Sequence, residues 1–322
     1  MSHKLVSTSP TFGFYVQEPV DYLKQHGCEV ELVPQGKKLT EDELVECASR
    51  VNAMIVGVEK ITQRVIEGGK NLKVIAKHGA GVDNIDMATA TAKGIVVTSA
   101  PGANSDAVAD LTFGLFLAAA RQIPTADRLV KGGEWPRIVG TAVNRKTLGI
   151  IGVGQIGKKV AKRARGFDME VLVYDVVKDE AFAAEFGATY VALDEVLTKA
   201  DFISIHVPLI DATRNLIGAR EFGLMKETAF LVNVARGGVV DEKALFDALQ
   251  EKRIAGAAAD VFTQEPAKGN PLLTLDNLIA TPHMGMYTRE ALIDTGMICV
   301  RNIVDALEGR KPEFLNNPEV LS

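Results

Sequence analysis

TLGIIGVGQIGKKVAKRARGFDMEVLVYD, at residues 147–175, is the stretch from which the fold of this chain is read most directly. An apolar strand at 148–151 leads into the glycine turn GVGQIG at 152–157, and an amphipathic segment with helical spacing follows it. A second strand, 170–174, ends on Asp175. Strand, glycine turn, helix, strand and acid form the context in which a GxGxxG sequence predicts a dinucleotide-binding unit.

Each glycine of this turn has its own physical task. Gly152 allows the chain to turn tightly, Gly154 lets the backbone approach a pyrophosphate, and Gly157 lets the helix pack close to the strand. The free N–H groups where the helix begins, at Gln155 and Ile156, are then expected to face the phosphates. An ordinary tight turn is the alternative reading of these glycines.

Asp175 predicts which dinucleotide is bound. It lies 18 residues after Gly157, where a carboxylate can accept hydrogen bonds from a ribose diol and would repel a 2′-phosphate. The nearest cation, Lys178, follows two valines instead of the acid itself. The sequence therefore predicts NAD in preference to NADP.

The composition excludes several classes of protein. The 322 residues are 47% hydrophobic and 24% charged, which suits about two globular domains. A net charge of −5 without a basic block argues against nucleic-acid or anionic-membrane partners. The three cysteines have no CxxC spacing and no neighbouring histidines, so we expect free thiols and no metal site. Without an apolar leader or membrane-length segment, a cytoplasmic protein is predicted.

The first hundred residues predict an open parallel sheet without a dinucleotide fingerprint. Short β-rich runs alternate with helical segments between residues 4 and 100, which is typical of an α/β unit. After the fourth predicted strand comes a glycine-rich turn, Gly79-Ala80-Gly81, whose N–H groups could hold a carboxylate. A plain connection between strand and helix is the alternative for this turn.

A long apolar helix, 104–122, is predicted to cross into the second domain, with Pro124 just past its end. Seven strands then recur regularly and predict one doubly wound sheet within residues 102–288. A last helix, 289–308, is expected to return to the first unit. The first domain would therefore be discontinuous, comprising residues 1–101 and 289–322. The loop with Trp135, the only tryptophan, is predicted to make a contact.

Polar residues follow three predicted strands of the second domain: Arg236 before two glycines, Glu265 before a proline, and His283 after another proline. Carboxyl ends of parallel strands meet at one crevice, so these residues are expected to lie together beside the cofactor. Hydride transfer to a carbonyl requires a proton donor and a cation. His283 suits the donor, Glu265 can hold its other ring nitrogen, and Arg236 matches a carboxylate. Singly, each residue could instead be structural.

The chain resembles the D-isomer-specific 2-hydroxyacid dehydrogenase family, especially members related to D-3-phosphoglycerate dehydrogenase. The resemblance runs from about Asn71 to Gly309 and rests on KHGAGVDNID, NSDAVADLTFGLFLAAAR, GIIGVGQIGKKVA, HVPLIDATRNLIG, LVNVARGGVVDEKAL, AAADVFTQEP and ATPHMGMYT. It implies a flavodoxin-like substrate domain and a Rossmann cofactor domain. It also implies residue roles: Arg236, Glu265 and His283 as the catalytic trio, the Gly79, Ala80 and Gly81 loop on the substrate carboxylate, His206, Pro208 and Asp260 beside the cofactor, and the helix from Asn104 with the Trp135 loop in a homodimer.

The expected function is NAD-dependent interconversion of a 2-oxo acid and its D-2-hydroxy acid, such as D-3-phosphoglycerate or the acids hydroxypyruvate and glyoxylate. Lys77-His78 stands where phosphoglycerate enzymes present arginine, which weakens the expectation of a phosphorylated substrate, although Lys60 could supply charge. Asp110 replaces a usual glutamate and Ile210 a usual threonine. Two alternatives stay open: an NAD(H)-sensing corepressor-like protein and a phosphite dehydrogenase-type relative.

Overall fold

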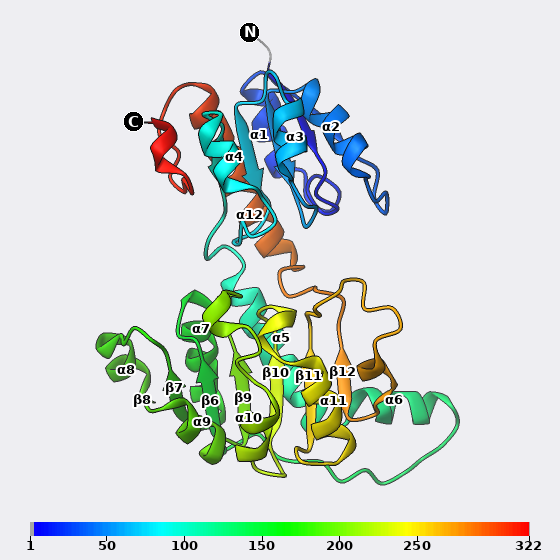
Figure 1. Cartoon of the computed structure of the whole chain (residues 1–322). Coiled ribbons are helices and arrows are strands. Elements are labelled where there is room, and N and C mark those ends of the chain that lie inside the picture. The colour runs from blue at the N-terminus through cyan, green and yellow to red at the C-terminus, as the bar shows by residue number, and fades with distance from the viewer. Residues whose placement is uncertain (1–2, 322) are drawn as a thin grey trace. The chain divides into compact units, whose positions relative to one another are not determined.

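The computed structural model describes residues 3–321. The chain divides into two compact units, one formed by residues up to Asn104 together with those from Met286 onward, the other by Ser105–Gly285 (Figure 1). Both units contain a wholly parallel sheet covered by helices, which confirms the predicted α/β class with two doubly wound sheets.

The first unit has a five-stranded sheet in the order β2-β1-β3-β4-β5, the flavodoxin-like arrangement with its switch point between β1 and β3. Strands β3, β4 and β5 are buried along almost their whole length because helices cover both faces, whereas the edge strand β2 alternates apolar and charged residues. Helices α2, α3 and α4 pack on one face, and α1 and α12 on the other. The elements are β1 His3–Ser7, α1 Glu18–Gln25, β2 Cys28–Leu32, α2 Glu41–Ser49, β3 Ala53–Val56, α3 Gln63–Gly68, β4 Val74–Lys77, α4 Met87–Ala92, β5 Val96–Thr98 and α12 Arg289–Leu307.

The second unit has a seven-stranded sheet in the order β12-β11-β10-β9-β6-β7-β8. Successive strands are added on one side of β6 up to β8 and on its other side from β9 onward, and ligands bind at such a switch point in open α/β sheets. Helices α5, α7 and α8 cover one face, and α9, α10 and α11 the other. The elements are α5 Ser105–Ala120, α6 Ile123–Lys131, β6 Thr147–Ile151, α7 Gln155–Ala164, β7 Glu170–Tyr174, α8 Glu180–Phe186, β8 Ala188–Tyr190, α9 Leu193–Lys199, β9 Phe202–Ile205, α10 Ala219–Leu224, β10 Phe230–Asn233, α11 Glu242–Gln250, β11 Gly256–Ala259 and β12 Leu278–Ala280.

The segment around Pro124 contains a helix that the sequence did not predict. α5 ends at Ala120 and Pro124 lies past its end as expected, but α6 begins at Ile123 with Pro124 in its first turn. A proline is tolerated at that position because its missing N–H would have no helical partner. The break between α5 and α6 is made by Gln122, whose φ of 52° is left-handed.

Asp110 makes a contact that its sequence position did not predict. Its Oδ1 accepts a hydrogen bond from Arg163 Nε at 2.6 Å, which ties α5 to α7. The neighbouring Asp106 also accepts from Arg163, at 3.1 Å. No helix among residues 3–321 is long and apolar enough to cross a membrane.

Candidate active site

In the glycine turn between β6 and α7, two glycines are tightly packed against backbone atoms and the third faces open space. A Cβ on Gly152 would lie 2.7 Å from the carbonyl carbon of His206, and one on Gly157 would lie 2.2 Å from the carbonyl oxygen of Gly152. Neither position can hold a side chain. Around Gly154, in contrast, a Cβ would meet no atom within 4 Å. The turn therefore leaves a cradle at Gly154 that a phosphate can enter.

The start of α7 is arranged to bind an anion in this cradle. Gly154 is the N-cap residue and offers no side chain to the first N–H groups, so these remain for a ligand. Gln155, the first helical residue, is exposed, and Ile156 is half-buried. Pyrophosphate recognition needs this combination of open backbone and helix dipole.

Asp175 lies against the same turn. Its Oδ2 accepts a hydrogen bond from the backbone N–H of Val153 at 2.6 Å, and its Oδ1 accepts from Val177 at 3.1 Å. Lys178 lies over the ring of Tyr190, with its Nζ 6.0 Å from the ring centroid. The acid thus borders the phosphate cradle, where a ribose of a bound dinucleotide would follow.

Arg236 and Glu265 are brought together by direct backbone contact between their loops. Arg236 follows β10, and the half-buried side chain donates from one guanidinium nitrogen to the carbonyl oxygen of Ala235 at 2.8 Å. The next residue, Gly237, touches the loop after β11, because a Cβ there would lie 2.1 Å from the carbonyl carbon of Phe262. Any other residue at 237 would push the two loops apart.

Glu265 and His283 form a hydrogen-bonded pair. His283 Nδ1 and Glu265 Oε2 are 2.8 Å apart, and Glu265 Oε1 accepts from the backbone N–H of Phe262 at 3.1 Å. Partial burial raises the pKa of Glu265, but the hydrogen bond and charge of His283, with the Phe262 N–H, lower it more. The carboxylate is therefore ionised at neutral pH and keeps the proton on Nδ1. The His283 side chain is 40% exposed, so its Nε2 edge can meet a substrate.

The turn that carries His283 is held by Asp260. This carboxylate is 1% exposed and accepts from Thr281 Oγ1 at 2.6 Å and from the N–H groups of Met284 and Gly285, each at 2.9 Å. The Asp260 carbonyl also accepts from the His283 N–H at 2.8 Å. These bonds maintain the left-handed backbone of His283, with a φ of 54°. The resemblance implied only a place beside the cofactor for Asp260, and this bonding was not predicted.

His206 and Pro208 follow β9 at the switch point. His206 Nε2 lies 2.5 Å from Ser204 Oγ, and burial lowers the pKa of His206 to about 3. The ring is therefore neutral near pH 7 and cannot supply a proton there. Pro208 is exposed. A place for His206 beside a bound cofactor stays a prediction.

The predicted carboxylate-binding loop lies in the first unit, directly after β4. Gly79 has a φ of 152° and its carbonyl accepts from Ala100 at 2.8 Å. Ala80 is exposed and Gly81 half-buried. Across the part of the chain that the structure describes, their two N–H groups donate no hydrogen bond to the protein. Both donors therefore remain available for an anion.

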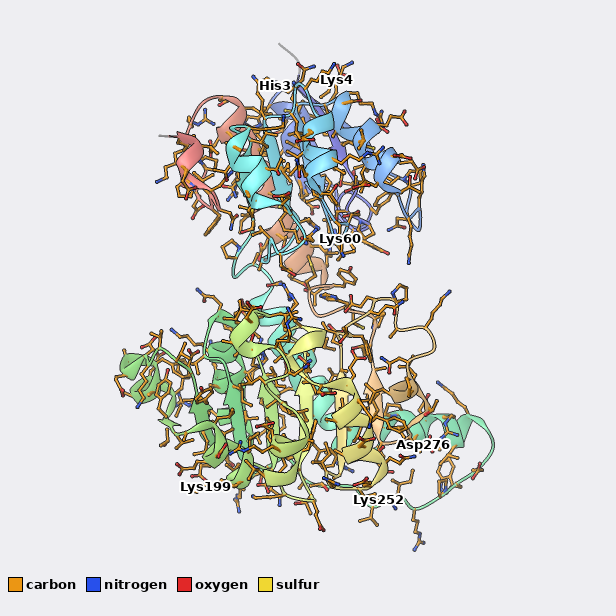
Figure 2. All side chains as sticks on the ribbon, in the orientation of Figure 1. His3, Lys4, Lys60, Lys199, Lys252 and Asp276 are labelled. Carbon is orange, nitrogen blue, oxygen red and sulfur yellow. The ribbon has the colours of Figure 1, made fainter. Side chains whose placement is uncertain are left out.

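Lys77 and His78, which precede this loop, are both engaged within the first unit. Lys77 Nζ donates to the carbonyl of Gly57 at 2.5 Å and to Asn84 Oδ1 at 2.8 Å. His78 is buried, with Nδ1 3.1 Å from Ser9 Oγ. Burial and then the charge of Lys77 lower the pKa of His78 to about 4, so its ring is neutral. Lys60, by contrast, is exposed at the end of its loop (Figure 2).

No group of histidine, cysteine and acidic side chains within residues 3–321 is arranged to hold a metal ion. The three cysteines, Cys28, Cys47 and Cys299, are buried free thiols.

The chain matches known proteins of one family. Residues 113–285 match the model described as "D-isomer specific 2-hydroxyacid dehydrogenase, NAD binding domain". The chain is 47% identical to D-3-phosphoglycerate dehydrogenase of Methanocaldococcus jannaschii over 91% of its length, but it spans only 57% of that protein. It is 40% identical to glyoxylate reductase of Thermococcus litoralis, covering 91% of this chain and 92% of the relative. The structure matches the TT0316 protein of Thermus thermophilus with a TM-score of 0.90 and 34% identity, covering 97% and 99% of the two chains.

The chain belongs to the D-isomer-specific 2-hydroxyacid dehydrogenase family, as its sequence motifs predicted. The matched region is the family's NAD-binding domain, in agreement with the cofactor predicted from the glycine turn and Asp175.

Proposed function

We propose that this member of the D-isomer-specific 2-hydroxyacid dehydrogenase family is an NAD-dependent enzyme that interconverts a 2-oxo acid and its D-2-hydroxy acid. The observation that carries the proposal is the Glu265–His283 pair, with 2.8 Å between Oε2 and Nδ1, on a loop in backbone contact with that of Arg236. A proton donor, its carboxylate partner and a guanidinium are the groups that reduction of a 2-oxo acid requires.

In the reducing direction, His283 protonates the carbonyl oxygen of the substrate from Nε2. Glu265 keeps the proton on Nδ1 and favours the charged ring. Arg236 binds the oxo oxygen and the carboxylate. The unbonded N–H groups of Ala80 and Gly81 support an anion-binding role for their loop in the first unit. When bound, the nicotinamide supplies the hydride to C2.

We assign the cofactor to the unit formed by Ser105–Gly285. Gly152, Gly154, Gln155, Ile156 and Gly157 would contact the pyrophosphate, and Asp175 the adenosine ribose. The bonding of Asp175 to Val153 places its carboxylate at the cradle and favours NAD over NADP. His206, Pro208 and Asp260 would border the nicotinamide side of the same crevice, with Asp260 also holding the turn of His283.

We propose an unphosphorylated acid as the substrate, in the class of glyoxylate or hydroxypyruvate. The amine of Lys77 is bound to Gly57 and Asn84, so it is already engaged by the protein. Glu59, on the same loop, lies with its Oε2 2.8 Å from the N–H of Gly57. Glu59 and Lys77 thus both bond to Gly57, and an ionised Glu59 would repel the two negative charges of a phosphate ester.

The test follows NADH oxidation by absorbance with glyoxylate, hydroxypyruvate, pyruvate, a branched 2-oxo acid and 3-phosphohydroxypyruvate. Turnover of glyoxylate or hydroxypyruvate, abolished by Arg236→Ala, is the expected result. A clear preference for 3-phosphohydroxypyruvate would reject the unphosphorylated class. Tight NADH binding without turnover of any acid would reject the enzymatic function.

We further propose a homodimer in the cytoplasm, built on α5 and the loop with Trp135. Trp135 is 87% exposed and Val139 is 89% exposed, an unusual state for large apolar side chains so close together in sequence. The buried free thiols suit a reducing compartment. Light scattering of wild type and Trp135→Ser tests the dimer, because the variant should dissociate at higher concentration. Monomeric wild type at micromolar concentration would contradict it.

A further inference from the structure

We propose that Glu242 is a positioning residue: its carboxylate fastens both ends of the loop that carries Glu265 and thereby sets where Glu265 meets His283. This inference rests on the proposed function, because Glu242 acts only through Glu265. The loop concerned is 263–270, called the Glu265 loop below.

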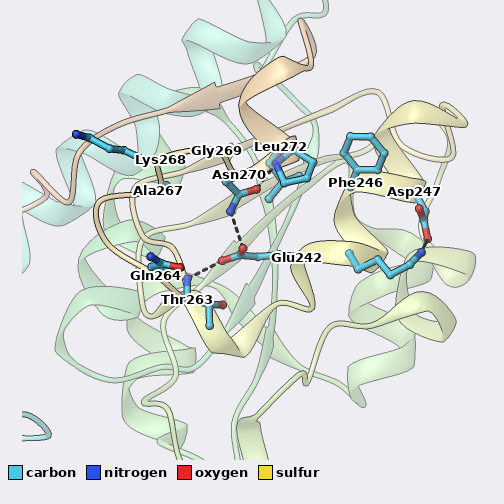
Figure 3. Close-up of a pocket in the computed structure, with 12 residues that line it drawn as sticks. Glu242, Phe246, Asp247, Thr263, Gln264, Ala267, Lys268, Gly269, Asn270 and Leu272 are labelled. Carbon is cyan, nitrogen blue, oxygen red and sulfur yellow. Dashed lines mark hydrogen bonds and ion pairs between the residues drawn. The ribbon is translucent and has the colours of Figure 1, made fainter.

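Glu242 is placed to act at both ends of this loop. It is the first residue of α11, whose start is held by Asp241, since the Asp241 side chain accepts from the N–H groups of Lys243 and Ala244. Glu242 Oε1 accepts from the N–H of Thr263 at 2.5 Å, and Oε2 accepts from Asn270 Nδ2 at 2.7 Å (Figure 3). One carboxylate therefore bonds the first and the last residue of the Glu265 loop.

The other contacts of the Glu265 loop are Ala267, which packs against the core, and two backbone hydrogen bonds within the loop itself, from Lys268 to Pro266 and from Asn270 to Ala267. Phe262 before it and Leu272 after it are buried in the core, but residues 263–266 between them are exposed. A pocket of about 570 Å³ lies behind the loop and is lined by Glu242, Thr263, Ala267, Asn270 and Leu272 among others. Because residues 263–266 are exposed and the loop borders this pocket, the hydrogen bonds of Glu242 are a main restraint on its position.

Glu242 is linked to the Glu265–His283 pair through the adjacent residues Thr263 and Phe262. Thr263 directly follows Phe262, whose N–H is bound by Glu265 Oε1 at 3.1 Å. The backbone of Phe262 and Thr263 also lies against Gly237, beside Arg236. Glu242 therefore holds Phe262 and Thr263, which contact Glu265 on one side and the loop of Arg236 on the other. Displacements of about 1 Å in such segments are enough to slow a reaction strongly.

A carboxylate is needed because both partners are donors. In Glu242→Gln one acceptor oxygen becomes an NH2 group, which would face either the Thr263 N–H or the Asn270 NH2. A second substitution can restore the match. In Glu242→Gln with Asn270→Asp, the glutamine oxygen accepts from Thr263 and its NH2 donates to the new carboxylate. That carboxylate can still accept from the N–H of Leu272, as Asn270 Oδ1 does at 3.0 Å.

The experiment compares wild type, Glu242→Gln, the double variant and Lys243→Ala. Lys243 is the adjacent residue and its exposed amine pairs with Asp247, so its loss is the matched control. Two quantities are measured: amide hydrogen exchange of the Glu265 loop, and kcat, KM and the pH profile of NADH oxidation. Thermal unfolding shows that each variant is folded.

Glu242→Gln should speed exchange in the Glu265 loop by about tenfold and lower kcat by about tenfold, with the KM for NADH unchanged. Its reduction should also fall off at lower pH, as expected when Glu265 holds His283 less well. The double variant should recover most of each effect, and Lys243→Ala should match wild type. Unchanged exchange in Glu242→Gln, faster exchange with unchanged kcat and pH profile, or a double variant no better than the single one would each overturn the inference. Absence of turnover in the wild type would instead reject the proposed function. The two failures can be told apart, because hydrogen exchange is measured without substrate and tests the restraint on the loop by itself.

Discussion

Replacing Glu265 by glutamine tests how the charge of this carboxylate controls His283. The substitution keeps the size of the side chain but removes the negative charge 2.8 Å from His283 Nδ1. The hydrogen bond and charge of His283 lower the pKa of Glu265, and this attraction is mutual, so removing the carboxylate weakens the pair as a proton donor. The reduction rate of Glu265→Gln should therefore begin to fall at a lower pH than that of wild type.

The size of the shift follows from charge and exposure. Two unit charges about 4 Å apart attract by about 1 kcal/mol in water and about 4 kcal/mol at an effective dielectric constant of 20. The side chains of Glu265 and His283 are 36% and 40% exposed, so solvent screens the pair and the lower part of this range applies. About 1–2 kcal/mol corresponds to roughly one pH unit. Above the wild-type midpoint the variant should be slower by a further factor of about ten.

The assay is the pH dependence of kcat/KM for NADH oxidation with the best acid of the panel, between pH 5 and 10. Glu251→Gln is a matched control, because it removes one negative charge from an exposed pair with Arg253. The control should follow the wild-type curve. Superimposable profiles for Glu265→Gln and wild type, or a shift to higher pH, would refute the electrostatic coupling of the pair.

Three further predictions concern packing, stability and cofactor choice. Gly237→Ala places a Cβ 2.1 Å from the Phe262 carbonyl carbon, so kcat should fall at least about a hundredfold in protein that circular dichroism shows to be folded; near-normal kcat would contradict the contact. Burial lowers the pKa of His78 to about 4 from its usual 6.5, so the unfolded chain binds a proton that the folded chain does not, and stability is lost as pH falls from 6.5 towards 4. In urea titrations, the free energy of unfolding should fall by about 2 kcal/mol between pH 7 and 5 through this residue. The His78→Gln variant should lack that part of the fall, and an equal fall in both proteins would count against it. Asp175→Ala should reduce the preference for NADH over NADPH in kcat/KM by about tenfold, and an unchanged ratio would mean that this acid does not meet the ribose.

Most of the fold was predictable from residues near one another in the sequence. Apolar runs of strand length that alternate with helical segments can be buried only as parallel strands covered on both faces, and both sheets are of this kind. The glycine turn was equally informative, since Gly152 and Gly157 leave no room for a side chain and Gly154 lies open. The end of the helix at Ala120 was less predictable, because the left-handed Gln122 makes the break and Pro124 begins the next helix.

The candidate site was predictable only in its outline. Arg236, Glu265 and His283 were recognisable because each follows a strand at the same edge of a parallel sheet. The 2.8 Å pairing of Glu265 with His283 agrees with that expectation. The two glycines after Arg236 were a signal for the close approach of Phe262, but no nearby residue indicated the partner.

The supporting bonds were visible only in three dimensions. Asp260 holds a turn 21 to 25 residues away, and Glu242 bonds Thr263 and Asn270, 21 and 28 residues away. Lys77 reaches back 20 residues to the carbonyl of Gly57, and this contact, not its charge alone, bears on the substrate. Local patterns specify which segments are buried, because burial depends on the spacing of apolar side chains along one element. Which donor meets which acceptor depends on distances between elements, and only the packed chain sets these.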